Sequence, residues 1–425
     1  MALNGNIAVA STSDGTITTY RQSASSSTWR TLPTLPVPRN QTASTSNNNN
    51  SSSSINNIRF GASLALSPQG LAVGAPTDVG SDGQTRGAVY AYQFNSLSNQ
   101  WTLLGSTIYG TTTMGAQDEH FGASVAMATS SKIVVVGAPQ SNQSSGAIYA
   151  FDYMAVNNAT AVFDWQPMVS TGTTIRGQPL GQGFANDALG TSVDISADGT
   201  MIVAGAPGTG YVVFYEWSPP TSSWLYLTRL DAPSFSEAFG STVVFLSPSG
   251  NVFAVGSPQH QNGQGSIRVY AILNGQTIQL GGNIVGDAKD FLGYTGTVSG
   301  SYHANGTSIL AGTAGGMVKR YDYIATSNTW EQKFQTVNAG FVAAVSGVSA
   351  NDGSTTFMVG SAGSDKVVFY DVAASAAPSP ISNTQQGSTG STMTPTLTST
   401  MASTVTSSFV SSTGQSASSS TGRPI

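Results

Sequence analysis

The stretch Phe60–Leu66 (FGASLAL), followed at Leu71–Pro76 by LAVGAP, decides the fold of this 425-residue chain because both parts recur. The later copies of the first part begin at Phe121, Leu189, Phe239, Leu292 and Phe341, so successive starts are 49 to 68 residues apart. A fixed element that returns at this spacing indicates a repeat architecture, in which each unit is completed by its neighbours.

Up to three further elements follow each start. The second motif, LAVGAP, returns at Val135–Pro139, Val203–Pro207 and Phe253–Pro258, and degenerate copies of it lie at Leu310–Thr313 and Met358–Ser361. A third is an aromatic strand such as Val89–Tyr92, and a fourth carries a tryptophan such as Trp101. Four short strands of period two, joined by Gly, Pro and Asn turns, are typical of one antiparallel propeller blade.

Counting the units predicts an all-β chain: a seven-bladed β-propeller of four-stranded antiparallel blades over residues 1–374. The first blade lacks a clear first strand apart from Met1–Leu3, and the last blade, Phe341–Val372, lacks a fourth. Either a segment of the tail closes the ring, or the chain begins inside a repeat. An Asn/Ser-rich insertion over residues 40–57 separates the first two blades.

The C-terminal segment 375–425 is predicted to be a disordered tail. Half of its residues are Ser or Thr, and Arg423 carries its only charge. Such a segment cannot bury a core. It fits an O-glycosylated stalk, or a plain linker to a further domain or anchor.

The repeat resembles the FG-GAP repeat of integrin α-chain propellers and of related surface proteins. In that family, the loop between the first two strands holds calcium through several carboxylates. The corresponding loops here, such as Ser67–Gly70 and Ser196–Thr200, contain at most one acid, whereas calcium needs six to eight oxygen ligands. The chain is therefore expected to be a calcium-free variant with no metal and no cofactor.

Composition limits the partners. Only 8% of residues are charged and the net charge is −5, so a nucleic-acid partner is not expected. There is no cysteine, and no apolar run is long enough to cross a bilayer. No signal peptide is visible at the N-terminus, which we interpret as a truncated start of an extracellular or cell-surface protein.

One set of acids keeps its register with the repeat, each lying two residues before the first strand of a blade: Glu119, Asp187, Glu237 and Asp290. The loops before the first strand share a face with the loops between the second and third strands. These acids could form an acidic ring that binds a cation or a basic partner. Alternatively, each carboxylate caps the backbone of its own turn.

No enzyme signature is evident from the sequence. His120, His260 and His303 lie in different blades without common spacing, so neither a zinc site nor a catalytic triad is indicated. Asp287 and Asp290 could be interpreted as a glycosidase pair, but any two acids near a propeller face would allow that interpretation. The sequence therefore predicts a protein that is not an enzyme.

Sequons for N-glycosylation are frequent, and most of them fall in predicted loops. They begin at Asn40, Asn49, Asn50, Asn142, Asn158 and Asn305. Glycans at these positions would supply solubility that the sparse surface charge does not.

These features predict an extracellular or cell-surface glycoprotein that serves adhesion, matrix or appendage assembly without catalysis. The expected partner is a protein or glycan at the loop face, with self-association as a further option. An alternative is a lectin-like module that binds carbohydrate or protein near Thr77–Arg86, Gln140–Ser145 and Gln259–Gly265. A propeller glycosidase or lyase is the third interpretation, because the fold alone does not choose among them.

Overall fold

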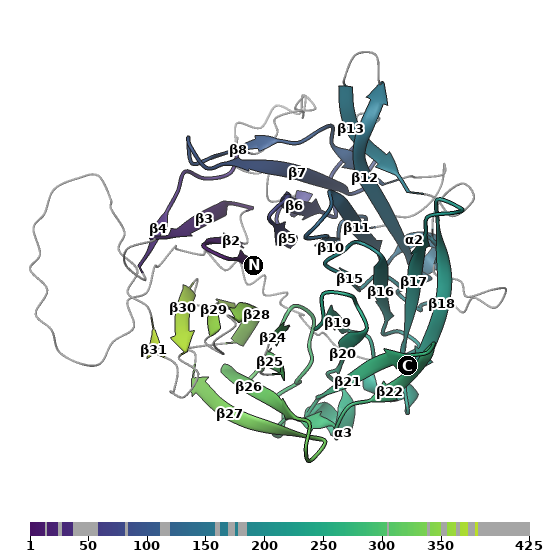
Figure 1. The fold of residues 1–425 in the computed structure, drawn as a ribbon, viewed down its shortest axis with the longest axis vertical. Helices are drawn as coiled ribbons and strands as arrows, with labels where there is room; N and C mark the ends of the chain where they lie inside the picture. The colour runs from purple at the N-terminus through teal and green to yellow at the C-terminus, as the bar shows by residue number, and fades with distance from the viewer. Residues whose placement is uncertain are drawn as a thin grey trace, which may run out of the picture.

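The computed structural model describes residues 1–12, 15–23, 28–36, 58–80, 84–110, 120–157, 162–168, 175–176, 185–303, 306–337, 341–349, 355–362, 366–372 and 379–380. These residues form seven β-sheets arranged as blades in a ring (Figure 1). The seven-bladed propeller of four-stranded antiparallel sheets is therefore confirmed.

Each blade contains four strands that follow one another in the sequence. Blade 1 contains β1 (Ala2–Asn4), β2 (Ile7–Ser11), β3 (Ile17–Gln22) and β4 (Trp29–Thr31). Blade 2 contains β5 (Ser63–Ser67), β6 (Gly70–Ala75), β7 (Ala88–Asn95) and β8 (Gln100–Leu103). Blade 3 contains β10 (Ser124–Met127), β11 (Ile133–Ala138), β12 (Ala147–Asn157) and β13 (Val162–Pro167). Blades 4 and 5 are β15 (Ser192–Ile195), β16 (Met201–Ala206), β17 (Tyr211–Ser218) and β18 (Ser223–Asp231); and β19 (Thr242–Phe245), β20 (Val252–Ser257), β21 (Ser266–Leu273) and β22 (Gln276–Gln279).

Blades 6 and 7 complete the ring. They are β24 (Val298–His303), β25 (Gly306–Gly312), β26 (Met317–Ile324) and β27 (Thr329–Val337); and β28 (Phe341–Ser349), β29 (Thr355–Ala362), β30 (Lys366–Val372) and β31 (Ser379–Pro380). Short additional strands pair with the third strand of blades 2, 3 and 5: β9 (Ile108–Tyr109), β14 (Ile175–Arg176) and β23 (Ile284–Val285). The described residues include the short helical elements α2 (Ser141–Ser144), η1 (Phe235–Glu237) and α3 (His260–Gly263).

The two incomplete blades are completed by short strands that the sequence pattern did not make clear. Residues Ala2–Asn4 form the first strand of blade 1, and Ser379–Pro380 pairs with β30 as the fourth strand of blade 7. A tail segment therefore completes the last blade, and the sheet extends past the predicted boundary at residue 374. Blades 1 and 7 meet where the Leu3 amide donates to Ser346 Oγ at 3.1 Å, and Trp29 stacks on Phe369. The remainder of the predicted tail lies outside the described residues.

The repeated glycines hold the blades together at close range. A Cβ on Gly205 of β16 would lie 1.9 Å from the carbonyl oxygen of Gly240, the glycine of the next Phe-Gly pair. Gly240 itself has φ +92°, a left-handed conformation that favours glycine. The same contact joins three other pairs: Gly74 with Gly122, Gly137 with Gly190, and Gly256 with Gly293. The Phe-Gly and Gly-Ala-Pro motifs recur because they form this backbone-to-backbone seam.

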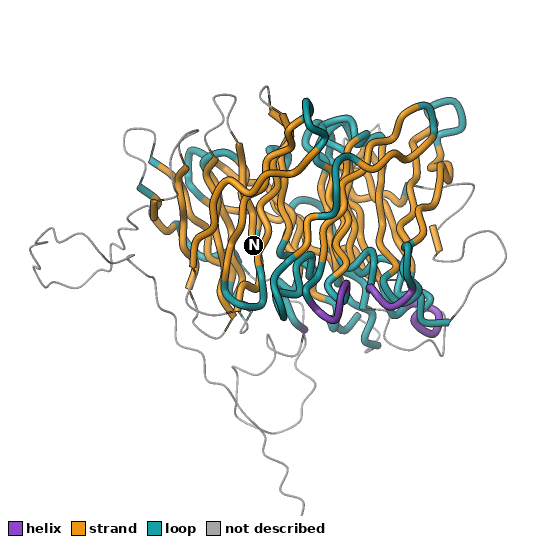
Figure 2. Tube along the Cα trace, turned by 90° about the horizontal axis from the view of Figure 1, so that it is seen from below, coloured by secondary structure: helices purple, strands orange, loops and turns teal. Residues whose placement is uncertain are grey.

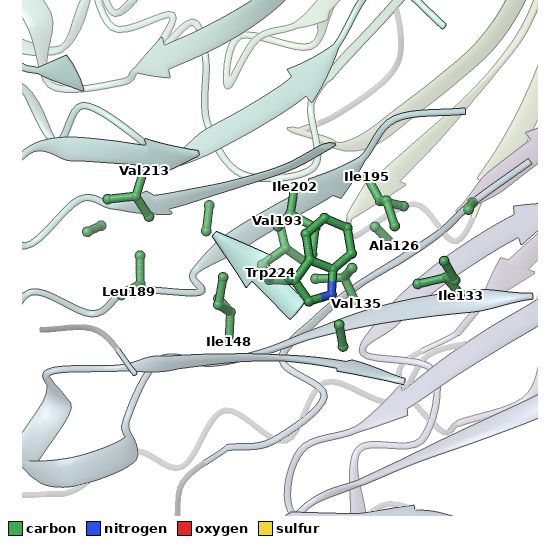
Figure 3. Close-up of a cluster of buried hydrophobic side chains, with 14 of the residues drawn as sticks. Ala126, Ile133, Val135, Ile148, Leu189, Val193, Ile195, Ile202, Val213 and Trp224 are labelled. Carbon is green, nitrogen blue, oxygen red and sulfur yellow. The ribbon is translucent and has the colours of Figure 1, made fainter. Parts of the chain in front are cut away.

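Tryptophans near the rim form a second seam. The indole N–H of Trp165 donates to the Leu104 carbonyl of the preceding blade at 2.7 Å, and Trp330 donates to Leu280 in the same way at 2.8 Å. The core between blades 3 and 4 packs Val135 and Ile148 against Ile202 and Trp224 (Figure 3). Burial of such large apolar groups between neighbouring sheets is the main stabilising contribution to this fold.

Candidate functional site

The loops before the first strand and those between the second and third strands lie on one face of the ring. The helical turns of the described chain gather on this face (Figure 2). They include α3, in the loop between β20 and β21, and η1, which ends at Glu237 just before β19. The Gln259 amide donates to the Glu237 carbonyl at 3.1 Å, which holds the two loops of blade 5 together.

A carboxylate, an imidazole and a guanidinium meet at this point. His260 Nδ1 lies 3.0 Å from Glu237 Oε1, and Arg268 Nη2 lies 2.7 Å from Glu237 Oε2. Arg268 also donates through Nη1 to Ser257 Oγ at 3.1 Å. The side chains are 13% exposed at His260, 10% at Glu237 and 3% at Arg268. The histidine is therefore the member of the cluster that reaches solvent most.

The backbone explains how these three side chains meet. Arg268 is the third residue of β21, and its side chain is anchored beside the end of β20 by Ser257. In α3, Gln261 and Asn262 have φ of 47° and 57°, so the chain makes a left-handed turn that places His260 at its start. Such a conformation costs about 1 kcal/mol or more for a residue with a side chain. Blade 3 repeats the turn in α2, with Ser141 in place of His260.

This arrangement suits proton transfer. His260 Nδ1 lies 3.0 Å from Glu237 Oε1 and 3.4 Å from Arg268 Nη2, so the contact to the carboxylate is the shorter of the two, and a proton on Nδ1 would face Glu237. A carboxylate on Nδ1 fixes the ring and its tautomer and leaves Nε2 as the basic nitrogen. The guanidinium of Arg268 forms an ion pair with the other carboxylate oxygen, Glu237 Oε2, at 2.7 Å.

A second charged cluster occupies the matching place in blade 6. Lys319 Nζ, on the third residue of β26, lies 2.7 Å from both Asp287 Oδ2 and Asp290 Oδ2. Burial alone would lower the pKa of Lys319, but the hydrogen bonds to the two carboxylates outweigh it and raise that pKa. Hydrogen bonding to Lys319 lowers the pKa of Asp287. The two acids therefore share a buried ammonium, which explains why they lie close together.

The predicted acids do not form an exposed ring where the structure describes them. Asp187, Glu237 and Asp290 are 2%, 8% and 7% exposed, and Glu119 lies outside the described residues. Asp187 accepts hydrogen bonds from Tyr211 Oη and Thr209 Oγ1, both at 2.8 Å. In all three blades, the acid pairs with a side chain on the third strand of its own blade. Of these three described acids, only Asp290 also accepts from its own turn, at the Asp287 amide.

From the sequence, His260 was named without being paired to Glu237, and Arg268 was not singled out. The histidines share no common spacing, because the partners of His260 come from another loop and from a strand of its own blade. The sequence did contain a signal for the pairing of these two residues, because Glu237 and His260 lie in two loops that were expected to share a face. Asn142 is exposed in α2, and the other five sequons begin outside the described residues. Within the described residues, no three His, Asp or Glu side chains are placed to hold a metal ion, and no helix is long and apolar enough to cross a membrane.

No family model and no curated protein sequence matches the chain. Among solved structures, it is similar to a provisionally named 6-phosphogluconolactonase of Bacteroides uniformis, with TM-score 0.57 and 12% identity over 86% of this chain and 90% of that one. A periplasmic gluconolactonase of Pseudomonas aeruginosa aligns with TM-score 0.55 and 15% identity, over 89% and 95%. At these identities, the likeness establishes the propeller fold.

Two expectations from the sequence are corrected by these neighbours. The chain was predicted to be no enzyme and to serve adhesion or assembly, yet the similar structures bear enzyme names, 6-phosphogluconolactonase and gluconolactonase. In blade 5, the structure also differs from what the sequence indicated. The histidines were treated as isolated, whereas the fold brings His260 to a buried carboxylate and guanidinium.

Proposed function

We propose that the protein is a hydrolase that opens cyclic esters of sugar acids, with His260 as the general base and Glu237 as the residue that orients it. The observation that carries this proposal is the 3.0 Å contact between His260 Nδ1 and Glu237 Oε1, clamped by Arg268 at 2.7 Å. The names of the structural neighbours supply the class of substrate.

The reaction would use water as the nucleophile. The water oxygen attacks the lactone carbonyl carbon while His260 Nε2 takes its proton, and Glu237 stabilises the imidazolium that forms. The tetrahedral intermediate then breaks the bond between the carbonyl carbon and the ring oxygen. The imidazolium returns the proton to that oxygen, and the product is an open-chain hydroxy acid. One water is consumed for each lactone opened, and His260 returns to its starting protonation state.

Two further proposals concern the relationships and location of the protein. We infer membership of the FG-GAP type of propeller from the four strong Phe-Gly and Gly-Ala-Pro pairs and from their contact across the blade seams. An extracellular location is supported by the sequons, of which Asn142 is exposed. Glycopeptide mass spectrometry of native protein from surface and cytosolic fractions tests the location.

A hydrolysis assay tests the enzymatic proposal. Purified protein is incubated with δ-gluconolactone, and acid release is followed above the spontaneous rate. His260→Gln should lower kcat/KM about 100-fold, the usual effect of losing a general base. Tyr211→Phe serves as the matched control, because it removes the corresponding contact to the acid of blade 4. Equal rates for wild type and His260→Gln would reject the proposal.

A further inference from the structure

The loop that carries His260 and the segment that carries Asp287 and Asp290 form one surface. The Phe291 amide donates to the Gly263 carbonyl at 3.0 Å, and the Leu292 amide donates to Gln264 at 3.1 Å. The Gly286 amide bonds to Gly265 in the same way at 3.1 Å. The residues from 286 to 292 therefore run along the α3 loop, and a molecule bound at His260 faces side chains of both blades.

The buried cations of this surface are already neutralised. Arg268 is paired with Glu237, and Lys319 is paired with both Asp287 and Asp290. Exposed Lys289 adds one positive charge to the segment. The described surface thus holds three acids, Glu237, Asp287 and Asp290, and three bases, Arg268, Lys289 and Lys319. With His260 counted as neutral, its formal net charge is zero. A phosphate ester carries about −1.5 to −2 charge and is normally met by surplus cations.

The uncharged side chains point to a different ligand chemistry. Gln259, Gln261 and Asn262 are exposed on the α3 loop around His260. Each carboxamide offers both donors and an acceptor, which is the complement of a sugar hydroxyl. Tyr294, 48% exposed, follows the segment that runs along the loop and offers an aromatic face for a sugar ring.

We propose that this surface binds an uncharged, hydroxyl-rich lactone and discriminates against its phosphorylated form. The inference rests on the proposed function for its ring chemistry, but it concerns recognition and can be measured without turnover. Gln259 is the residue expected to contribute to recognition without touching the proton transfer. It has an ordinary backbone conformation, with φ −92°, so its replacement adds no strain.

The test is calorimetric titration with δ-gluconolactam, which resists hydrolysis, and with its 6-phosphate. The neutral lactam should bind on the order of tenfold more tightly than the phosphate. Gln259→Ala should weaken lactam binding on the order of fivefold, the effect of one neutral hydrogen bond. Gln140→Ala, the same position in the α2 loop of blade 3, should leave binding unchanged.

The possible outcomes separate the two proposals. Equal or tighter binding of the phosphorylated lactam would overturn the inference even if lactones are hydrolysed. Failure of both compounds to bind would overturn it as well. Preferential binding of the neutral lactam together with no hydrolysis of the lactone would support this inference and reject only the proposed function.

Discussion

His260 Nδ1 lies 3.0 Å from Glu237 Oε1, although the two residues are separated by the first two strands of blade 5. The contact exists because the loop before β19 and the loop after β20 return to the same face of the propeller. Arg268, on the next strand of the same blade, completes the cluster. A single blade therefore contains all three ionisable groups of the proposed site.

The first prediction concerns the buried ion pair. Glu237→Ala leaves the Arg268 guanidinium, 3% exposed, without its carboxylate. Removal of one partner of a buried pair should lower the free energy of unfolding by about 3 kcal/mol, measured by urea denaturation. Glu331→Ala is the control, since its pair with Lys333 is 59% and 38% exposed and should cost less than about 1 kcal/mol. Equal losses in the two variants would contradict the assigned burial of the cluster.

The second prediction concerns the glycine seam. In Gly205→Ala, the new methyl group would meet the Gly240 carbonyl oxygen at 1.9 Å, so two blades must separate locally. We expect a loss of about 1–3 kcal/mol in unfolding free energy, as for other overpacked sites. Gly282→Ala is the control because nothing lies within 4 Å of the place that its new methyl group would take. If Gly205→Ala unfolds with the same midpoint as wild type, the seam does not determine blade spacing.

The third prediction concerns pH. Asp194 on β15 accepts the Phe245 amide of the next blade at 2.7 Å and the Ile195 amide at 2.9 Å. Burial raises the pKa of Asp194 to about 7, against the opposing effect of these hydrogen bonds. Since the folded pKa lies above the usual value of 3.8, the stabilising contribution of the protonated group is complete below about pH 4 and is lost as pH rises through 7.

The measurement for Asp194 is unfolding free energy as a function of pH. Wild type should lose roughly 1–3 kcal/mol more than Asp194→Asn between pH 4 and pH 7.5. Asp231→Asn is the control, because that carboxylate is 63% exposed at the rim. Parallel curves for wild type and Asp194→Asn would show that Asp194 does not titrate in this range.

The sequence was sufficient for the fold because the repeat residues are themselves the contacts between blades. Gly205 and Gly240 recur in register since each seam needs a bare backbone at both positions. It was insufficient at the ring closure, where Ala2–Asn4 and Ser379–Pro380 are too short to show a strand pattern.

The site was harder to predict than the fold for a physical reason. The acids before each first strand were found by register, but their partners on the third strand differ: Tyr211 in blade 4, Arg268 in blade 5 and Lys319 in blade 6. A repeat pattern shows only the residues that the blades share, and these partners are not among them. Of the three described acids of this set, Glu237 is the one that the packing of its blade places beside an imidazole, that of His260.

The most direct test of the central claim is a double-mutant cycle on δ-gluconolactone hydrolysis with Glu237→Gln, His260→Gln and both together, each checked for folding by circular dichroism. If Glu237 acts only through His260, each single variant should lower kcat/KM by about 100-fold, and the double variant should lose about the same. Losses that multiply to about 10⁴-fold in the double variant, or single variants as active as wild type, would contradict the claim that these two residues work as one unit.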